Sequence, residues 1–134
     1  REDLIDILKG MKMYEIGELT ELSSNQNGST YEFLAIPSEG YLLAYRKAGS
    51  ISGNHYHKGN SAAKNPERLL LVSGEMSLSL KHLETGDSAV IKLIGPKLIT
   101  IKPKVLHTLK AESDVVFLEF NSLQEHKEDT YYPV

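Results

Sequence analysis

The stretch that decides the fold covers residues 49–74 and reads GSISGNHYHKGNSAAKNPERLLLVSG. His55 and His57 are separated by one residue in a segment of strand character, so their side chains leave from the same face. Glu67 opens an apolar run, and strand alternation places its side chain on the same side as Leu69. A carboxylate buried there needs a cation, a strong donor or a proton. A metal ion held by the two imidazoles would satisfy it.

Simpler explanations are open for each of these residues. A single His-x-His pair is also found on protein surfaces without any role. Glu67 could be solvated at the start of its strand, or it could pair with Lys64 or Arg68. The metal site is therefore one interpretation among several until other residues are considered.

A third histidine, His107, follows Pro103 by four residues, after the alternating strand Ile99–Ile101. Proline restricts the backbone and fixes the direction in which the next strand starts. Taken alone, His107 would be an ordinary core or surface histidine. His82, near a turn, and His126, in the charged tail, are expected to be solvated.

Around this stretch, short β-branched and aromatic runs alternate with turn residues at intervals of about 8–12 residues, which is typical of a sandwich or barrel. The predicted class is therefore all-β, with polar loops at residues 23–29 and 58–66. The predicted strands are Met13–Ile16, Thr30–Ile36, Tyr41–Lys47, Gly53–His57, Glu67–Ser73, Glu75–His82, Ser88–Ile94, Leu98–Ile101, Leu106–Lys110 and Val115–Asn121.

The two ends of the chain differ from this pattern. Residues 3–11 predict a short helix, because Asp3 can cap it and the apolar residues after it recur at helical spacing. Residues 124–134 form a charged and then aromatic tail, which is expected to cross a neighbouring subunit or to lie over the barrel mouth. The runs Leu69–Val72 and Val115–Leu118 are apolar on both faces, so a homodimer is expected to cover the outer one.

Composition excludes several classes of protein. The chain has 134 residues, which favours one domain, and it has no cysteine, which excludes disulfides and thiolate metal sites. A net charge of −3 with scattered lysines gives no sign of a nucleic-acid surface. The apolar runs are too short to cross a membrane, and we expect a cytoplasmic protein.

The spacing of these residues resembles the first motif of the cupin family. That motif has a glycine, five residues, His-x-His, then a glutamate, six residues and a second glycine. In this chain the corresponding residues are Gly49, His55, His57, Glu67 and Gly74. The resemblance implies a double-stranded β-helix, which is the jelly-roll barrel of cupins.

The second cupin motif ends in a proline and glycine turn before a histidine. Here the segment Pro103-Lys104-Val105-Leu106-His107 is similar to it. The resemblance implies that one divalent metal ion, Zn, Fe, Mn or Ni, is bound by His55, His57, Glu67 and His107. Affinity order alone does not choose among these metals.

Two features depart from the family pattern. The gap between His57 and Glu67 has nine residues, where the family has three or four, so residues 58–66 form an insertion beside the expected barrel mouth. Lys104 stands where the motif has glycine. If that position needs a positive φ angle, lysine is strained there.

Two short matches suggest a substrate class. Gly53–Lys58 resembles the His-x-His-Lys stretch of sugar-nucleotide ketoisomerases and epimerases, and Asp129–Val134 is similar to the end of the cupin domain of capsular-polysaccharide epimerases. The resemblance implies proton abstraction next to a carbonyl, with His55 or His57 as base if no metal is present. If these histidines bind a metal, Tyr45 or another residue would have to act as the base.

The resulting prediction is a single cupin domain at residues 1–134, with a short helix at 1–12, the barrel at 13–123 and the tail at 124–134. It binds a small-molecule ligand or substrate in the barrel and acts as a sugar or sugar-nucleotide isomerase or epimerase in polysaccharide biosynthesis. Two alternatives are open, because one fold hosts many chemistries. They are a metal-dependent oxygenase or lyase on a small organic substrate, and a ligand-binding or sensing module without turnover.

Overall fold

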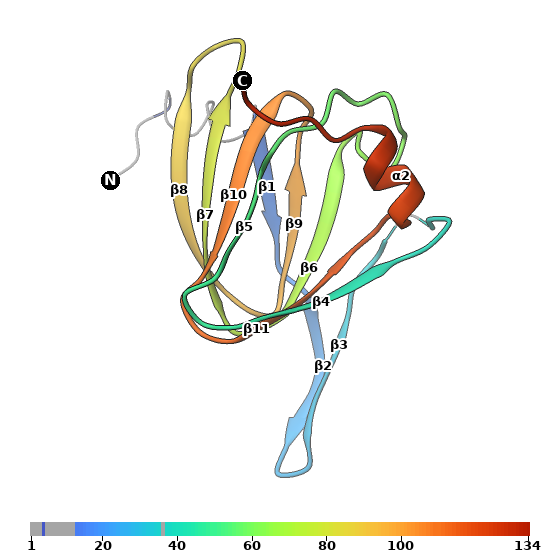
Figure 1. Ribbon diagram of the computed structural model, residues 1–134. Coiled ribbons are helices and arrows are strands. Elements are labelled where there is room, and N and C mark those ends of the chain that lie inside the picture. Colours follow the sequence, from blue (N-terminus) through green and yellow to red (C-terminus); the bar gives the residue numbers. More distant parts are fainter. Residues whose placement is uncertain (1–3, 5–12, 36) are drawn as a thin grey trace.

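Two antiparallel sheets face each other in the computed structural model, which describes residues 4, 13–35 and 37–134 (Figure 1). Five strands form one sheet in the order β1-β9-β6-β11-β4, and four form the other in the order β5-β10-β7-β8. The strands are β1 (Tyr14–Gly17), β2 (Thr20–Asn25), β3 (Gly28–Glu32), β4 (Leu42–Arg46), β5 (Ile51–His55), β6 (Glu67–Ser73), β7 (Glu75–His82), β8 (Ser88–Ile94), β9 (Lys97–Ile101), β10 (Val105–Ala111) and β11 (Val115–Glu119). The predicted all-β barrel is therefore confirmed.

The barrel core comes from the inward faces of the central strands. Leu71 of β6, Leu78 of β7 and Ile99 of β9 are completely buried, and each alternates with a more exposed neighbour. Full burial of such a side chain contributes about 1.5–3 kcal/mol. The turn between β6 and β7 needs Gly74, because its φ is +96° and an added Cβ would lie 2.2 Å from the Asp114 carbonyl oxygen.

Most strands lie where the sequence predicts them, and β6, β7 and β8 begin and end at the predicted residues. The prediction of a polar loop at 23–29 is wrong, because β2 and β3 form a hairpin that extends over these residues. Every residue of both strands is exposed, so neither strand has a buried face. The alternation of apolar and polar residues that marks a half-buried strand is therefore missing from this segment. The hairpin projects from the lower end of the barrel in Figure 1.

The C-terminal segment crosses the opposite, upper end of the barrel in Figure 1. It contains helix α2 (Leu123–Glu128), where no helix was predicted, and α2 starts with a capping box formed by Ser122 and Glu125. Of the two predicted paths, the tail takes the one over the barrel mouth. The predicted helix at 3–11 lies outside the described residues except for Leu4. No helix within the described ranges is long and apolar enough to span a membrane.

Candidate metal centre

Three histidines predicted as ligands meet between the two sheets at the barrel mouth. His55 ends β5 and lies opposite His107 of β10 in the register of the four-stranded sheet. His57 follows two residues later, and one ring nitrogen of each of the three lies within 4.8 Å of the others. His57 and His107 are buried, and His55 is half-buried.

An irregularity in β5 directs His55 into this site. The pairing with β10 shifts between His107 and Thr108, so that Asn54 is an extra residue on the β5 side. Gly53 and Asn54 both have positive φ angles, +87° and +56°. A Cβ at Gly53 would lie 2.9 Å from the His107 carbonyl oxygen, so the close approach of the two strands requires glycine.

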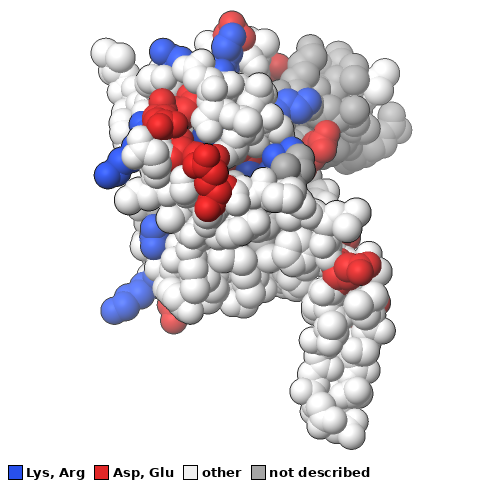
Figure 2. Space-filling view, turned by 90° about the vertical axis from the view of Figure 1, so that its right-hand side faces the viewer, with Lys and Arg blue, Asp and Glu red and all other residues white. Residues whose placement is uncertain are grey.

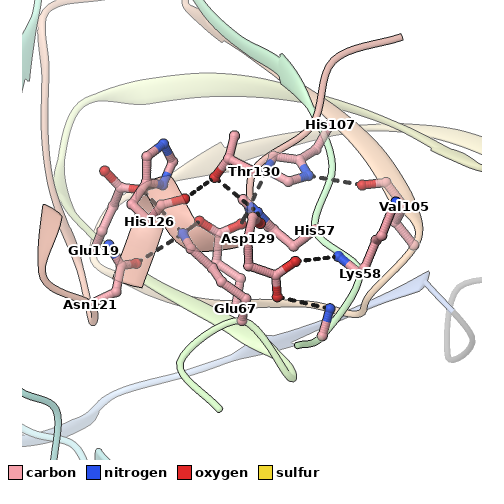
Figure 3. Close-up of polar contacts among 12 residues, drawn as sticks. His57, Lys58, Glu67, Val105, His107, Glu119, Asn121, His126, Asp129 and Thr130 are labelled. Atoms are coloured by element: carbon pink, nitrogen blue, oxygen red, sulfur yellow. Dashed lines mark hydrogen bonds and ion pairs between the residues drawn. The ribbon is translucent and has the colours of Figure 1, made fainter. Parts of the chain in front are cut away.

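Glu67 completes the group from the opposite sheet. It is the first residue of β6 and is 1% exposed. Its Oε2 lies 2.8 Å from His57 Nε2 and 3.1 Å from His107 Nε2. The structure therefore brings all four predicted ligands together, and it shows that the alternative of a solvated Glu67 is wrong. Figure 3 shows three of them, His57, Glu67 and His107.

Backbone carbonyls fix which ring nitrogens face Glu67. His57 Nδ1 lies 2.7 Å from the Asp129 carbonyl oxygen, and His107 Nδ1 lies 2.9 Å from that of Val105. A carbonyl only accepts, so each Nδ1–H donates, and the Nε2 atom of each ring is the one that faces Glu67 Oε2.

Two imidazole nitrogens that face one carboxylate oxygen need a proton or a cation between them and that oxygen. His107 Nε2 is buried and has no hydrogen-bond partner, because its short distance to Glu67 does not have hydrogen-bond geometry. A divalent ion among the three Nε2 or Nδ1 atoms and Oε2 would satisfy these groups, and neutral imidazole and carboxylate are suitable ligands. The residues present therefore fit a metal ion.

The second oxygen of Glu67 already has a cationic partner. Lys64 Nζ lies 3.0 Å from Glu67 Oε1 and 3.0 Å from Asn121 Oδ1, and the Lys64 side chain is 0% exposed. The pairing of Glu67 with Lys64 was one of the open alternatives, and the structure shows it. Burial would raise the pKa of Glu67, but His107, His57 and Lys64 together hold that pKa well below its ordinary value.

A cavity of about 120 Å³ lies against this group, and its walls include Arg46, His55, Glu119 and His126. Burial and the nearby His107 lower the pKa of His55 to about 3, so its ring is neutral at pH 7 and can bind a metal. Burial and the Lys64 charge lower the pKa of His126 to about 4. Burial and the Glu67 charge raise the pKa of Glu119 to about 7.

The prediction that His126 is solvated is therefore wrong. Helix α2 places its ring 5.4 Å from that of His55, between ring centroids, and its Nδ1 is buried without a hydrogen-bond partner. His82, by contrast, ends β7, and its Nδ1 accepts from the backbone N–H groups of Glu84 and Thr85 in the turn that follows. The sequence of the tail does not predict helix α2, so it does not predict that His126 lies at the site.

The structure does not bring Tyr45 to the histidines. Tyr45 is 68% exposed on the outer face of β4, because its neighbour Ala44 takes the inward position. Arg46, which points the other way, lines the cavity and lies over the Phe117 ring. Strand alternation across β4 could have indicated this arrangement, because Leu42, Ala44 and Arg46 share one face.

Lys104 occupies the motif position that usually has glycine. Its φ is +66°, so the position has the left-handed conformation expected for the glycine of the motif. The Lys104 N–H donates to the His57 carbonyl oxygen at 2.7 Å, and the side chain pairs with exposed Glu84. The turn before His107 is thus retained with lysine, and it is tied to the segment that carries His57.

Comparison with known proteins gives structural relatives only. No family model matches the chain, and no curated protein matches its sequence. The capsular polysaccharide assembling protein CapF from Staphylococcus aureus superposes with a TM-score of 0.57 and 21% identity over 86% of this chain. That match covers 34% of CapF, so the chain spans about a third of its length.

Two further solved structures are similar over most of their own length. A dTDP sugar isomerase from Desulfovibrio desulfuricans has a TM-score of 0.70 and 11% identity, over 90% of this chain and 83% of its own. The dTDP-6-deoxy-D-glucose-3,5-epimerase RmlC from Legionella pneumophila has a TM-score of 0.63 and 16% identity, over 89% and 71%. The chain therefore shares the jelly-roll fold of these RmlC-like structures, which is the fold that its resemblance to the two cupin motifs implied.

Proposed function

We propose that this chain is a metal-binding cupin that isomerises or epimerises a sugar or sugar nucleotide in polysaccharide biosynthesis. The observation that carries the proposal is the group of His55, His57, His107 and Glu67 at the wall of a cavity. Support for the substrate class comes from the relatives. One is a sugar 3,4-ketoisomerase, QdtA from Thermoanaerobacterium thermosaccharolyticum, in complex with TDP, and RmlC was solved with dTDP-4-keto-L-rhamnose.

The four residues would hold one divalent ion, Zn, Fe, Mn or Ni. When bound, such an ion polarises a carbonyl or hydroxyl oxygen of the substrate and makes the neighbouring C–H more acidic. The fixed Nδ1–H bonds of His57 and His107 orient both rings for this purpose. Glu119, whose pKa is raised to about 7, lies at the cavity wall and is placed to exchange a proton with the substrate.

The size of the cavity limits what enters it. Pockets that enclose a whole drug-sized ligand have about 300–1,000 Å³, whereas this cavity has about 120 Å³. Only the reacting part of a sugar would enter, and the rest would lie at the mouth. Arg46 lines the cavity and is largely exposed, so it is suited to an anionic group of the substrate that stays outside.

A metal-free reaction is the second candidate, because Lys64 already gives Glu67 a cation. In that case a histidine would be the base. Both ring nitrogens of His57 are engaged, by Asp129 and by Glu67, so His55 would have to act. Its pKa of about 3 makes it a weak base, which favours the metal-dependent reaction.

A second copy of the chain is the proposed partner. Apolar side chains are exposed on the hairpin, as in Leu22 and Tyr31, and on the outer face of β4, as in Leu43 and Tyr45. A two-stranded hairpin is marginally stable alone in water, so packing against another subunit would stabilise it. Figure 2 shows it standing clear of the barrel, with acidic groups near its base. A single domain at 1–134 and a cytoplasmic location stay predictions.

The metal is tested by elemental analysis of the native protein, of His57→Ala and of His82→Ala. About one divalent ion per chain is expected in the native protein and in His82→Ala, because His82 bonds to the turn after β7 and does not line the cavity. His57→Ala should lose the ion while its circular dichroism stays native. Native protein without metal, or with metal retained in His57→Ala, would overturn the assigned ligands.

The reaction is tested by incubation with dTDP-4-keto-L-rhamnose in deuterated water, followed by mass spectrometry. Exchange of a sugar C–H for deuterium is expected, and loss of that exchange in metal-free protein would show that the ion is needed. Exchange that persists without metal would favour histidine acid–base chemistry. Bound iron with oxygen consumption would indicate an oxygenase, and the absence of any exchange would favour a binding module.

A further inference from the structure

Asp129 lies at the end of α2 and is 0% exposed. Its carboxylate accepts three backbone N–H bonds, from Lys58 at 2.9 Å, Gly59 at 3.0 Å and Ser61 at 3.0 Å. Figure 3 shows the bond from Lys58. Bonds from N–H groups to an ionised acceptor are stronger than those between neutral groups. One buried side chain therefore fixes the loop that starts directly after His57.

The backbone of Asp129 contacts the site as well. Its carbonyl oxygen accepts the Nδ1–H of His57 at 2.7 Å. Two residues further on, Tyr131 exchanges a pair of backbone hydrogen bonds with Tyr56, both at 2.9 Å. The C-terminal segment thus lies along the His55–His57 stretch, and Asp129 is the point where it reaches both a ligand ring and the loop.

The loop held by Asp129 leads directly to the buried cation. Residues 58–61 precede Lys64, whose ammonium group contacts Glu67 and Asn121. Asn121 in turn precedes the N-cap residue of α2. Both sides of the metal centre, His57 and the Lys64–Glu67 pair, therefore depend on how the C-terminal segment is attached.

We propose that Asp129 is a positioning residue of the metal centre, which holds the His57 ring through its carbonyl and the loop of residues 58–61 through its carboxylate. The inference rests on the proposed metal binding. Partners that orient metal ligands change metal affinity by about 10–100-fold when they are removed. The position of the His57 ring thus depends on a residue that is 72 positions away in the sequence.

The test is a Co²⁺ titration of the full chain and of Asp129→Asn, followed by calorimetry and by the visible absorption of the ion. Asparagine keeps the size and the backbone carbonyl, but its amide NH₂ would face N–H donors. We expect Co²⁺ binding weakened about tenfold or more and an altered absorption spectrum. Asp114→Asn is the matched control, because the Asp114 carboxylate accepts one N–H bond, from Ala48, on an exposed turn. It should bind Co²⁺ as the native protein does.

A second measurement does not need the metal. The ¹⁵N shifts of the imidazole nitrogens in metal-free protein should show a single Nδ1–H tautomer for His57, and a mixture in Asp129→Asn. If both the Co²⁺ affinity and the tautomer of Asp129→Asn match the native protein, the inference is wrong. If Asp129→Asn does not fold, Asp129→Ser, which keeps one acceptor, is expected to show the same two changes.

The two proposals fail in different ways. A native protein that binds no Co²⁺ contradicts the proposed metal centre, and the tautomer of His57 then decides on Asp129 alone. If the native protein binds Co²⁺ and Asp129→Asn matches it in both Co²⁺ affinity and His57 tautomer, the positioning role is contradicted and the metal centre stays in place.

Discussion

Polar residues are buried at the mouth of the barrel and exposed at its other end. At the mouth, Lys64, Asn121 and Asp129 are 0% exposed, and each is bonded to a group from a distant part of the chain. At the other end, β2 and β3 pair with each other and every residue is exposed. The polar residues at the mouth therefore bond to other parts of the same chain, whereas the hairpin presents its residues to solvent or to a partner. This difference predicts where substitutions destabilise the monomer and where they do not.

The largest effect is expected for Lys64→Met. Removal of one partner of a buried ion pair leaves the other charge uncompensated, which costs about 3–5 kcal/mol. Urea denaturation of metal-free protein should show this loss of unfolding free energy. Lys97→Met is the control, because its partner Glu18 is largely exposed and the pair should contribute less than about 1 kcal/mol. Equal effects of the two substitutions would remove the distinction between the mouth and the surface.

A smaller effect is expected for Ser122→Ala at the start of α2. The Ser122 side chain accepts the Glu125 N–H, and the Glu125 carboxylate accepts the Ser122 N–H, so the substitution removes half of the capping box. Loss of an N-cap serine costs about 1 kcal/mol, measured here by urea denaturation. Gln124→Ala, on the exposed side of the same helix, should change stability by only a few tenths of that value. A loss of several kcal/mol in Ser122→Ala would show that α2 supports the barrel more widely.

The smallest effect on monomer stability is expected when the hairpin is shortened. Thr20 pairs with Glu32, so residues 21–31 can be replaced by Asn-Gly as a two-residue turn. Because this removes exposed residues only, the unfolding free energy should change by less than about 0.5 kcal/mol. Light scattering should show a dimer in the native protein and in the control Val90→Ser, and a monomer in the shortened variant. A shortened protein that loses its metal would show that the hairpin supports the site.

The sequence predicts the barrel well where strands carry an apolar pattern. The bounds of β6, β7 and β8 match because their apolar residues are bounded by turn residues. The strand β2 escapes prediction, because its serines and asparagine are more typical of loops. The two hairpin strands are held by pairing with each other, so they lack the buried apolar residues on which a strand prediction depends.

The same limit applies to the site. The resemblance to the two cupin motifs implies His55, His57, Glu67 and His107, and the structure brings these four residues together. Nothing in the loop of residues 58–66 indicates that the Lys64 ammonium is buried. Its partner Asn121 is 57 positions away, and a loop contact of that kind depends on the folded path of the chain.

The buried lysine also bears on how firmly an ion would be retained. Glu67 supplies the single negative charge of the four ligands, and Lys64 cancels that charge before any ion arrives. A divalent ion would thus meet ligands whose one negative charge is already paired, so the electrostatic attraction is weaker than in a cage with an unpaired carboxylate. Retention of one ion per chain would then depend mainly on the coordination bonds to the three imidazoles and the carboxylate.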